Sequence, residues 1–370
     1  GVSPGVLMPS AANSKKRDPI KPWFEALESM GEYIGIRFGH LRPGSGEVEW
    51  IYFPHSECDG IGAFAHMFRE AGIPLEALPQ ISHPAAYGWK PFFQALPKLL
   101  GPRRRLAWNE LPRGEPLEDT NQPAPAVAWH VFSETETREL LDASRSAGVT
   151  LNSFLLKHLD SALRPDLADP GAAMPWMVPV NIRGKVNRES DTENHTSYVA
   201  FHITAEDSLN EVHGHIYRTL DRGEHWAAWK GYRATRLLPR AIKRLAIKTD
   251  RVISQWNVGG FSNLGVWDRD NEIDHDSLAG SWLFCPPVLR CQMVGAGCVT
   301  FQNRLSLLIQ VHPDLTTAPE VPRKWLERWL SFMEAPRRES ANGAGADEQS
   351  PQERTGPEGP QRQQAVQATP

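Results

Sequence analysis

The sequence has few cysteines and lacks any long apolar run. Its four cysteines, Cys58, Cys285, Cys291 and Cys298, match no zinc-ligand spacing and are too few for a disulfide framework in 370 residues. We therefore expect reduced thiols, no bound metal and a cytoplasmic location. The apolar segment around 282–299 contains two prolines and an arginine, so the sequence predicts no transmembrane segment. The first residues also lack the basic-then-apolar layout of a secretory signal.

The sequence also has no strong excess of either charge. The formal net charge is −4, which gives no reason to expect nucleic acid as a partner. Apolar residues make up 40% and charged residues 23%, as is usual for a globular protein with a sizeable core. The length favours one large or two medium domains.

Composition changes divide the chain into segments. Residues 1–20 are small and polar, and residues 335–370 are rich in Gln, Gly, Pro and Glu, so both ends are predicted to be disordered. The proline-bounded stretch 165–175 is predicted to link an N-terminal lobe, 21–165, to a C-terminal lobe, 175–334.

Hydrophobic periodicity predicts strands that alternate with helices. The predicted strands are 33–41, 47–53, 126–132, 176–183, 197–204, 254–263, 281–285, 289–294, 297–302 and 305–312. The predicted helices are 61–70, 133–148, 150–163, 208–221, 233–250 and 321–333. Two of these helices begin with a capping box, in which Ser133 pairs with Glu136 and Ser208 with Glu211.

One histidine and one aspartate lie four residues apart where a predicted strand gives way to a helix. A neutral imidazole such as that of His55 can accept a proton from a hydroxyl, amine or thiol at neutral pH. Asp59 can hold the loop through an ion pair, and Gly60 lets the backbone turn before the helix. The alternative is purely structural, with His55 at a strand end and Asp59 as the N-cap of the helix. The motif alone does not separate the two.

The predicted helix 233–250 is strongly basic. It carries Arg236, Arg240, Lys243, Arg244 and Lys248. These cations could attract CoA phosphates, an acidic carrier protein or, as a peripheral contact, an anionic membrane surface. They could equally be an ordinary solvated face, with the interspersed leucines and isoleucine buried.

Four short stretches carry a resemblance to a known family, and they occur in the same order as in that family. They are His55-Ser56-Glu57-Cys58-Asp59-Gly60, Gly148-Val149-Thr150-Leu151-Asn152-Ser153, Val178-Pro179-Val180-Asn181-Ile182-Arg183 with Glu193-Asn194 downstream, and Phe261-Ser262-Asn263-Leu264-Gly265. In these stretches the chain resembles the superfamily of CoA-dependent acyltransferases. This superfamily includes chloramphenicol acetyltransferase, the plant BAHD acyltransferases, wax ester synthases and the condensation domains of nonribosomal peptide synthetases. Pro54 stands where many of the last two groups have a second histidine.

The resemblance implies an α/β fold of two chloramphenicol-acetyltransferase-like lobes. Each lobe would be a mixed β-sheet flanked by helices, with a channel between the lobes. It also implies an acyltransferase with no permanently bound cofactor, whose co-substrate is an acyl thioester on CoA or on a carrier protein. The acceptor would be a small molecule with a hydroxyl or an amine. A catalytically silent relative that binds a carrier protein or an acyl ligand is the alternative.

The resemblance also implies roles for individual residues. His55 would be the general base, and the acceptor would attack the thioester directly without an acyl-enzyme. Asp59 would point away from the substrate and pair with Arg183. Ser262 and Asn263 would stabilise the oxyanion or contact the substrate.

Overall fold

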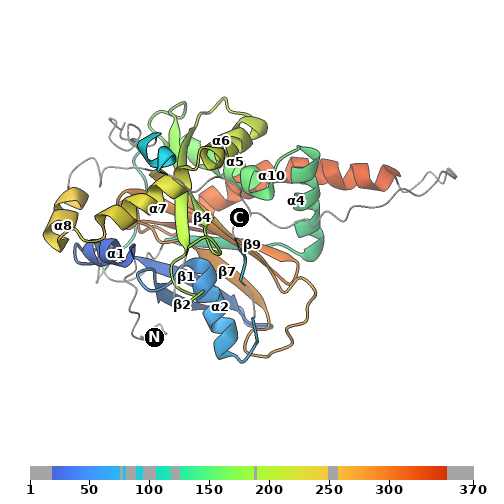
Figure 1. Ribbon diagram of the computed structural model, residues 1–370. Coiled ribbons are helices and arrows are strands. Elements are labelled where there is room, and N and C mark those ends of the chain that lie inside the picture. Colours follow the sequence, from blue (N-terminus) through green and yellow to red (C-terminus); the bar gives the residue numbers. More distant parts are fainter. Residues whose placement is uncertain are drawn as a thin grey trace, which may run out of the picture.

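The computed structural model describes residues 19–75, 78–80, 89–94, 106–117, 126–186, 190–248 and 257–347. Within these residues the strands form one sheet of six and one of three. Figure 1 shows the smaller sheet low in the molecule, beside α2 (Gly60–Glu70) and below α5 (Leu151–Leu163) and α6 (Leu209–Asp221). The predicted α/β class, with two sheets flanked by helices, is confirmed. The predicted disorder of 1–18 and 348–370 lies outside the described residues.

The larger sheet is mixed, with strand order β3-β9-β8-β6-β4-β5. The central neighbours β4, β6 and β8 run parallel to one another, and the remaining pairs are antiparallel. The strands are β3 (Val127–Val131), β4 (Met174–Asn181), β5 (Thr196–Ile203), β6 (Asn257–Trp267), β8 (Gln292–Phe301) and β9 (Arg304–Val311).

The smaller sheet is antiparallel and contains the predicted strands 33–41 and 47–53 as a hairpin. Its strands are β2 (Val48–Pro54), β1 (Gly35–Leu41) and β7 (Ser281–Cys285), in that order. Because β7 pairs here and β3 pairs with β9, each sheet contains a strand from the far side of the predicted linker 165–175. Each of the two sheets is therefore built from both the N-terminal and the C-terminal part of the chain.

One long strand, β8, stands where the two strands 289–294 and 297–302 were predicted. Gly295 and Gly297 lie where β8 passes close to β7. A Cβ at position 297 would stand 2.3 Å from the carbonyl oxygen of Phe284. The glycines therefore allow close approach of two strands and do not form a turn.

Helices cover the larger sheet and make its core. α4 (Glu134–Ser146), α5 and α10 (Glu320–Asp347) pack together, and α6 contacts β5. Both predicted capping boxes are present, at Ser133 and Ser208. The buried tryptophans Trp176, Trp325 and Trp329 belong to this core. α2 packs on a second core, rich in phenylalanine, beside the smaller sheet.

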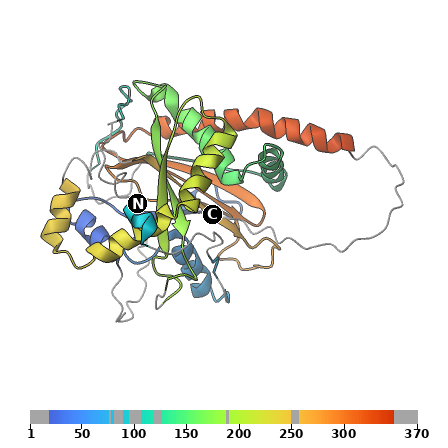
Figure 2. The same cartoon turned by 45° about the horizontal axis from the view of Figure 1, so that its top comes forward.

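The predicted basic helix 233–250 is wrong as a single element. The chain instead forms α7 (Glu224–Thr235) and α8 (Arg240–Lys248), separated at Pro239. Proline has no N–H to continue the helical hydrogen bonds, and it favours the first turn of a helix, so α8 begins there. α8 lies against α1 (Lys21–Glu28), an element that sequence periodicity did not predict (Figure 2).

The closing helix was predicted to end near residue 333, but α10 continues to Asp347. Residues 335–347 of the predicted tail are therefore helical. Pro336 lies inside the helix and removes one backbone donor. The next residue, Arg337, ties this part of α10 to α4, because its Nη1 lies 2.7 Å from Glu136 Oε1.

Candidate active site

The His55 loop is held by backbone hydrogen bonds at the end of β2. The His55 amide donates to the carbonyl oxygen of Ile34 at 3.0 Å, and the Glu57 amide donates to that of Pro54 at 3.0 Å. α2 then begins at Gly60. The loop is thus fixed between a strand and a helix, which lets it present a side chain in one orientation.

The His55 ring is oriented by the loop itself. Its Nδ1 lies 2.9 Å from the carbonyl oxygen of Cys58, and its ring centroid lies 4.7 Å from that of Phe24. A carbonyl oxygen only accepts hydrogen bonds, so Nδ1 carries the proton. In the neutral ring Nε2 is then the basic nitrogen. The geometry therefore gives the imidazole the tautomer of a general base acting through Nε2.

Asp59 is fully buried and receives hydrogen bonds on both carboxylate oxygens. Oδ1 caps α2 by accepting from the Gly62 amide at 2.8 Å. Oδ2 accepts from the His195 amide at 2.8 Å and from the Thr196 hydroxyl at 2.9 Å. Arg183 completes the set, with Nη2 2.6 Å from Oδ1. The structure thus brings the two predicted partners together, and it also gives Asp59 the N-cap position of the structural alternative.

The charge state of Asp59 follows from these contacts. Burial alone would raise the pKa of its carboxyl, but the Arg183 guanidinium and the backbone donors outweigh burial and lower that pKa below its ordinary value. Arg183 is itself enclosed, with Nε donating to the Asp191 carbonyl oxygen at 2.9 Å and Nη1 to Asn181 Oδ1 at 3.1 Å. The pair is a structural bridge between α2 and the end of β4.

Segment 190–196 supports the His55 loop, and sequence periodicity gave it no role. Asn194 Nδ2 donates to the carbonyl oxygen of His55 at 2.5 Å. Arg69 on α2 makes two 2.7 Å hydrogen bonds to the Asp191 carboxylate. A Cβ at Gly62 would lie 2.0 Å from the Thr192 carbonyl oxygen, so α2 and this segment pack without room for a side chain. The available signal was the Glu193-Asn194 pair in the stretch that resembles the family.

Ser262 and Asn263 lie on β6 just before a bulge. The register with β8 shifts between Asn263 and Val266, and Gly265 has a φ of +81°, which glycine tolerates. Asn263 fixes this bulge because its Oδ1 accepts from the Gly265 amide at 2.8 Å. Its Nδ2 donates to Asn152 Oδ1 at 2.6 Å, which joins the second and fourth family-like stretches. The Ser262 hydroxyl makes no hydrogen bond to any residue that the structure describes.

Five predicted site residues line one small cavity of about 50 Å³. They are His55, Asp59, Gly60, Ser262 and Asn263. Arg183 is not among the lining residues, in keeping with its position behind Asp59. The base and the Ser262 hydroxyl therefore face the same space.

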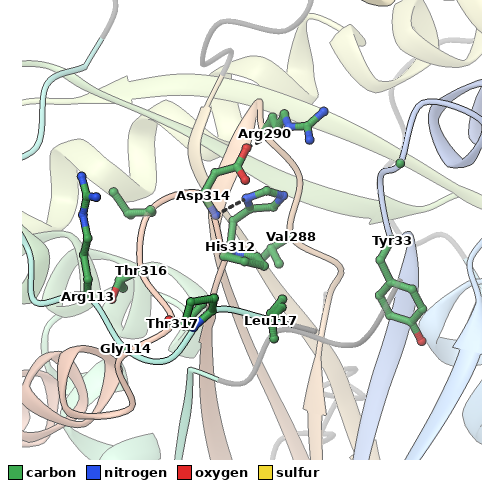
Figure 3. Close-up of a pocket in the computed structure, with 14 residues that line it drawn as sticks. Tyr33, Arg113, Gly114, Leu117, Val288, Arg290, His312, Asp314, Thr316 and Thr317 are labelled. Atoms are coloured by element: carbon green, nitrogen blue, oxygen red, sulfur yellow. Dashed lines mark hydrogen bonds and ion pairs between the residues drawn. The ribbon is translucent and has the colours of Figure 1, made fainter. Parts of the chain in front are cut away.

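A larger cavity of about 500 Å³ shares no lining residue with this one. Pro286 and Pro287 line the small cavity, and Val288, the next residue, lines the large one. Figure 3 shows His312 and Asp314 at the centre of the large cavity, between Arg113 and Tyr33. His312 Nδ1 accepts from the Asp314 amide at 3.1 Å, and Nε2 lies 3.5 Å from Glu32 Oε2. Sequence reasoning assigned none of these residues to a site.

Cys58 does not provide a nucleophile. Burial raises the pKa of its thiol well above the ordinary value, so the thiol stays protonated at neutral pH. The residues that the structure describes contain no group of three or more His, Cys, Asp or Glu side chains placed to hold a metal ion. Within the same residues, no helix is long and apolar enough to cross a membrane.

Comparison with known proteins supports the fold. No protein-family model matches the sequence, and a search of curated proteins finds no match. Among solved structures, the cyclization-docking bidomain of the nonribosomal peptide synthetase EpoB from Sorangium cellulosum is similar, with a TM-score of 0.51 and 10% identity over 78% of this chain and 59% of that one. The nonribosomal peptide synthetase FmoA3 has a TM-score of 0.50 and 13% identity, over 79% of this chain and 31% of its own.

An acetyltransferase structure is also similar. It is TRI3, a trichothecene 15-O-acetyltransferase from Fusarium sporotrichioides, with a TM-score of 0.48 and 12% identity over 88% of this chain and 76% of that one. This chain spans about 59% and 31% of the length of the two synthetase chains. At these identities the likeness is one of fold alone, and the α/β fold predicted from the sequence agrees with that of the two synthetase structures.

Proposed function

We propose that this chain, which has the fold of the CoA-dependent acyltransferase superfamily, transfers an acyl group from a thioester to a hydroxyl or amine acceptor. The thioester is carried by CoA or by a carrier protein. The observation that carries the proposal is the hydrogen bond of His55 Nδ1 to the Cys58 carbonyl oxygen, because it makes Nε2 the basic nitrogen beside a cavity.

The reaction proceeds by direct attack. His55 Nε2 takes the proton from the acceptor, whose oxygen or nitrogen bonds to the thioester carbonyl carbon. The Ser262 hydroxyl donates to the oxyanion of the tetrahedral intermediate, a type of contribution worth about 3 kcal/mol in other enzymes. The carbon–sulfur bond then breaks, and the thiolate takes the proton from His55. Asp59 and Arg183 position the loop, and Asn263 fixes the bulge that carries Ser262.

The larger cavity supports the same proposal. Its volume of about 500 Å³ falls within the usual range for small-molecule sites, roughly 300–1,000 Å³. Val288 in its lining directly follows Pro286 and Pro287, which line the His55 cavity. We propose that one of the two substrates occupies it.

A second candidate is a catalytically silent module that binds a carrier protein or an acyl ligand. The observation in its favour is the volume beside His55, about 50 Å³, which is far below the roughly 300 Å³ of a usual small-molecule site. A module of this kind would bind its partner without releasing thiol.

The deciding experiment measures thiol release from a panel of acyl-CoAs and acyl carrier proteins with candidate alcohols and amines. His55→Ala should lower kcat/KM by about 10²–10⁴-fold, the usual contribution of a general base. His275→Ala, a change of an exposed histidine in the loop after β6, is the matched control and should leave the rate unchanged. Turnover that survives in His55→Ala contradicts the role of His55. Carrier-protein binding with no turnover in the wild type favours the silent module.

A further inference from the structure

α8 exposes its apolar side chains and buries a lysine. Leu245 is 65% exposed, Ile242 47% and Leu237, just before the helix, 69%, whereas Lys243 is only 2% exposed. The alternative in which these apolar residues are buried beneath a solvated basic face is therefore wrong. An amphipathic helix of a globular protein normally turns its apolar side to the core, whereas α8 turns Ile242 and Leu245 outward and buries Ile247 together with Lys243.

Contacts of the lysine hold α8 in this orientation. Lys243 Nζ donates to the carbonyl oxygens of Arg236, at 3.0 Å, and Leu238. These carbonyls belong to the turn between α7 and α8, so one ammonium group satisfies two backbone acceptors there. Arg240 Nη2 also donates to the Glu25 carbonyl oxygen of α1 at 3.1 Å. The exposed apolar side is thus a built feature of the fold.

The basic residues form a stripe beside the apolar one. Arg240, Arg244 and Lys248 recur every four residues, while Ile242 and Leu245 are three apart. On a helix these spacings place two stripes side by side, and all five residues are exposed. We define the α8 surface as these two stripes with the residues of the preceding turn, namely Arg236, Leu237, Leu238, Arg240, Ile242, Arg244, Leu245 and Lys248.

Within the described residues, few carboxylates lie near the cations of the α8 surface in the sequence. No Asp or Glu occurs between residues 225 and 248. Arg236, Arg244 and Lys248 make no ion pair with any residue in the part of the chain that the structure describes. The neighbouring helix α1 carries Glu25 and Glu28, two carboxylates against the four exposed cations of the α8 surface. The surface therefore keeps a positive potential next to exposed apolar side chains.

We propose that the α8 surface binds the anionic surface of a lipid bilayer. A basic stripe beside an apolar stripe is the arrangement of a helix that lies in the plane of the membrane interface, with cations at the lipid headgroups and apolar side chains at the acyl boundary. Bilayers that expose phosphatidylserine or another anionic headgroup supply both layers at once. This binding would bring the protein to a membrane whatever reaction the His55 site performs.

The test is flotation of the full chain with vesicles of pure phosphatidylcholine or with 30% phosphatidylserine added. The wild type should float with the anionic vesicles and not with the neutral ones. The variant R244E/K248E should weaken this partition about tenfold or more, since each cation near an anionic surface contributes roughly 1 kcal/mol. The variant L237S/L245S should weaken it about fivefold or more, because it removes apolar contact at fixed charge.

The matched control is R138E/R323E, which makes the same change of charge on exposed positions of α4 and α10. It should leave the partition near the wild-type value, and circular dichroism should show all variants folded. Equal flotation with neutral and anionic vesicles, or none with either, overturns the proposal. The proposal is also overturned if L237S/L245S floats as well as the wild type. In that case charge alone would explain the binding, and any anionic protein or polymer could replace the bilayer.

Discussion

Two buried aspartate–arginine pairs in this protein look alike and behave differently. At the site, Arg183 Nη2 lies 2.6 Å from Asp59, and in α5, Arg164 Nε lies 2.6 Å from Asp160. Both carboxylates are almost inaccessible to solvent. Yet the pKa of Asp59 is lowered below its ordinary value, whereas burial raises the pKa of Asp160 to about 6.

The number and origin of the donors explain the difference. Asp59 accepts from two backbone amides, a hydroxyl and Arg183. Gly62 is local, whereas Arg183, His195 and Thr196 reach it from more than 120 residues away. Asp160 accepts from Arg164 one turn away and from Trp176 Nε1 at 2.8 Å. Arg164 also donates to three backbone carbonyls, which share its charge. In this protein, the carboxylate beside the candidate site is therefore the one whose donors include groups from a distant part of the chain.

The largest difference between the two ion pairs is expected when each carboxylate is neutralised. Asp59→Asn leaves Arg183 buried without its counter-charge, so it should lower the free energy of unfolding by about 3 kcal/mol. Asp160→Asn should cost about 1 kcal/mol, because the fold already favours a neutral group at that position. Urea unfolding at pH 7 measures both. Equal losses in the two variants would show that the donor sets do not matter.

Activity provides the companion measurement. Asp59→Asn should also reduce thiol release, because Asp59 anchors the loop that carries His55. Asp160→Asn should leave turnover unchanged and serves as the matched control, since it makes the same chemical change outside the cavity. Slower thiol release by Asp160→Asn would give Asp160 a part in the reaction, although it does not line the His55 cavity.

The pH dependence of stability should have opposite signs at the two positions. The stabilisation by Asp59 is present above the usual carboxyl pKa of about 4 and is lost as the pH falls through its lower folded value. Between about pH 4 and pH 6, Asp160 holds a proton in the folded protein that the unfolded chain has released. Its contribution to the free energy of unfolding therefore falls as the pH rises from about 4 to about 6.

Urea midpoints between pH 3 and pH 7 should show both effects. The cost of Asp59→Asn should shrink below about pH 4, by up to about 1.4 kcal/mol per pH unit. The cost of Asp160→Asn should be largest near pH 4 and shrink toward pH 7. Parallel pH curves for the two variants would contradict the opposite pKa directions.

Sequence reasoning succeeded where the signal was local. The His55 loop lies between a strand and a helix whose hydrophobic periodicities are both visible in the sequence. A capping box is likewise recognised from residues that are three apart. It named Asn194 only through the family resemblance and gave neither Asn194 nor the His195 amide a role, because these groups reach the loop from about 140 residues away through packing that leaves no local pattern. It also merged α8 with α7 and left open which way the apolar side chains face, since periodicity gives the apolar side of a helix but not its direction.

The smallest predicted effect concerns a neutral hydrogen bond that joins distant segments, for comparison with the Asp59–Arg183 ion pair. Asn152 and Asn263 join distant segments through one neutral hydrogen bond of 2.6 Å, as Asp59 and Arg183 do through an ion pair. Asn152→Ala, Asn263→Ala and the double variant form a cycle whose coupling energy should be about 1 kcal/mol, the usual value for a neutral hydrogen bond. Asn263→Ala should cost more than Asn152→Ala, because it also releases the Gly265 amide and the bulge that carries Ser262. Equal costs with no coupling would mean that bridging distant segments has no energetic weight without charge.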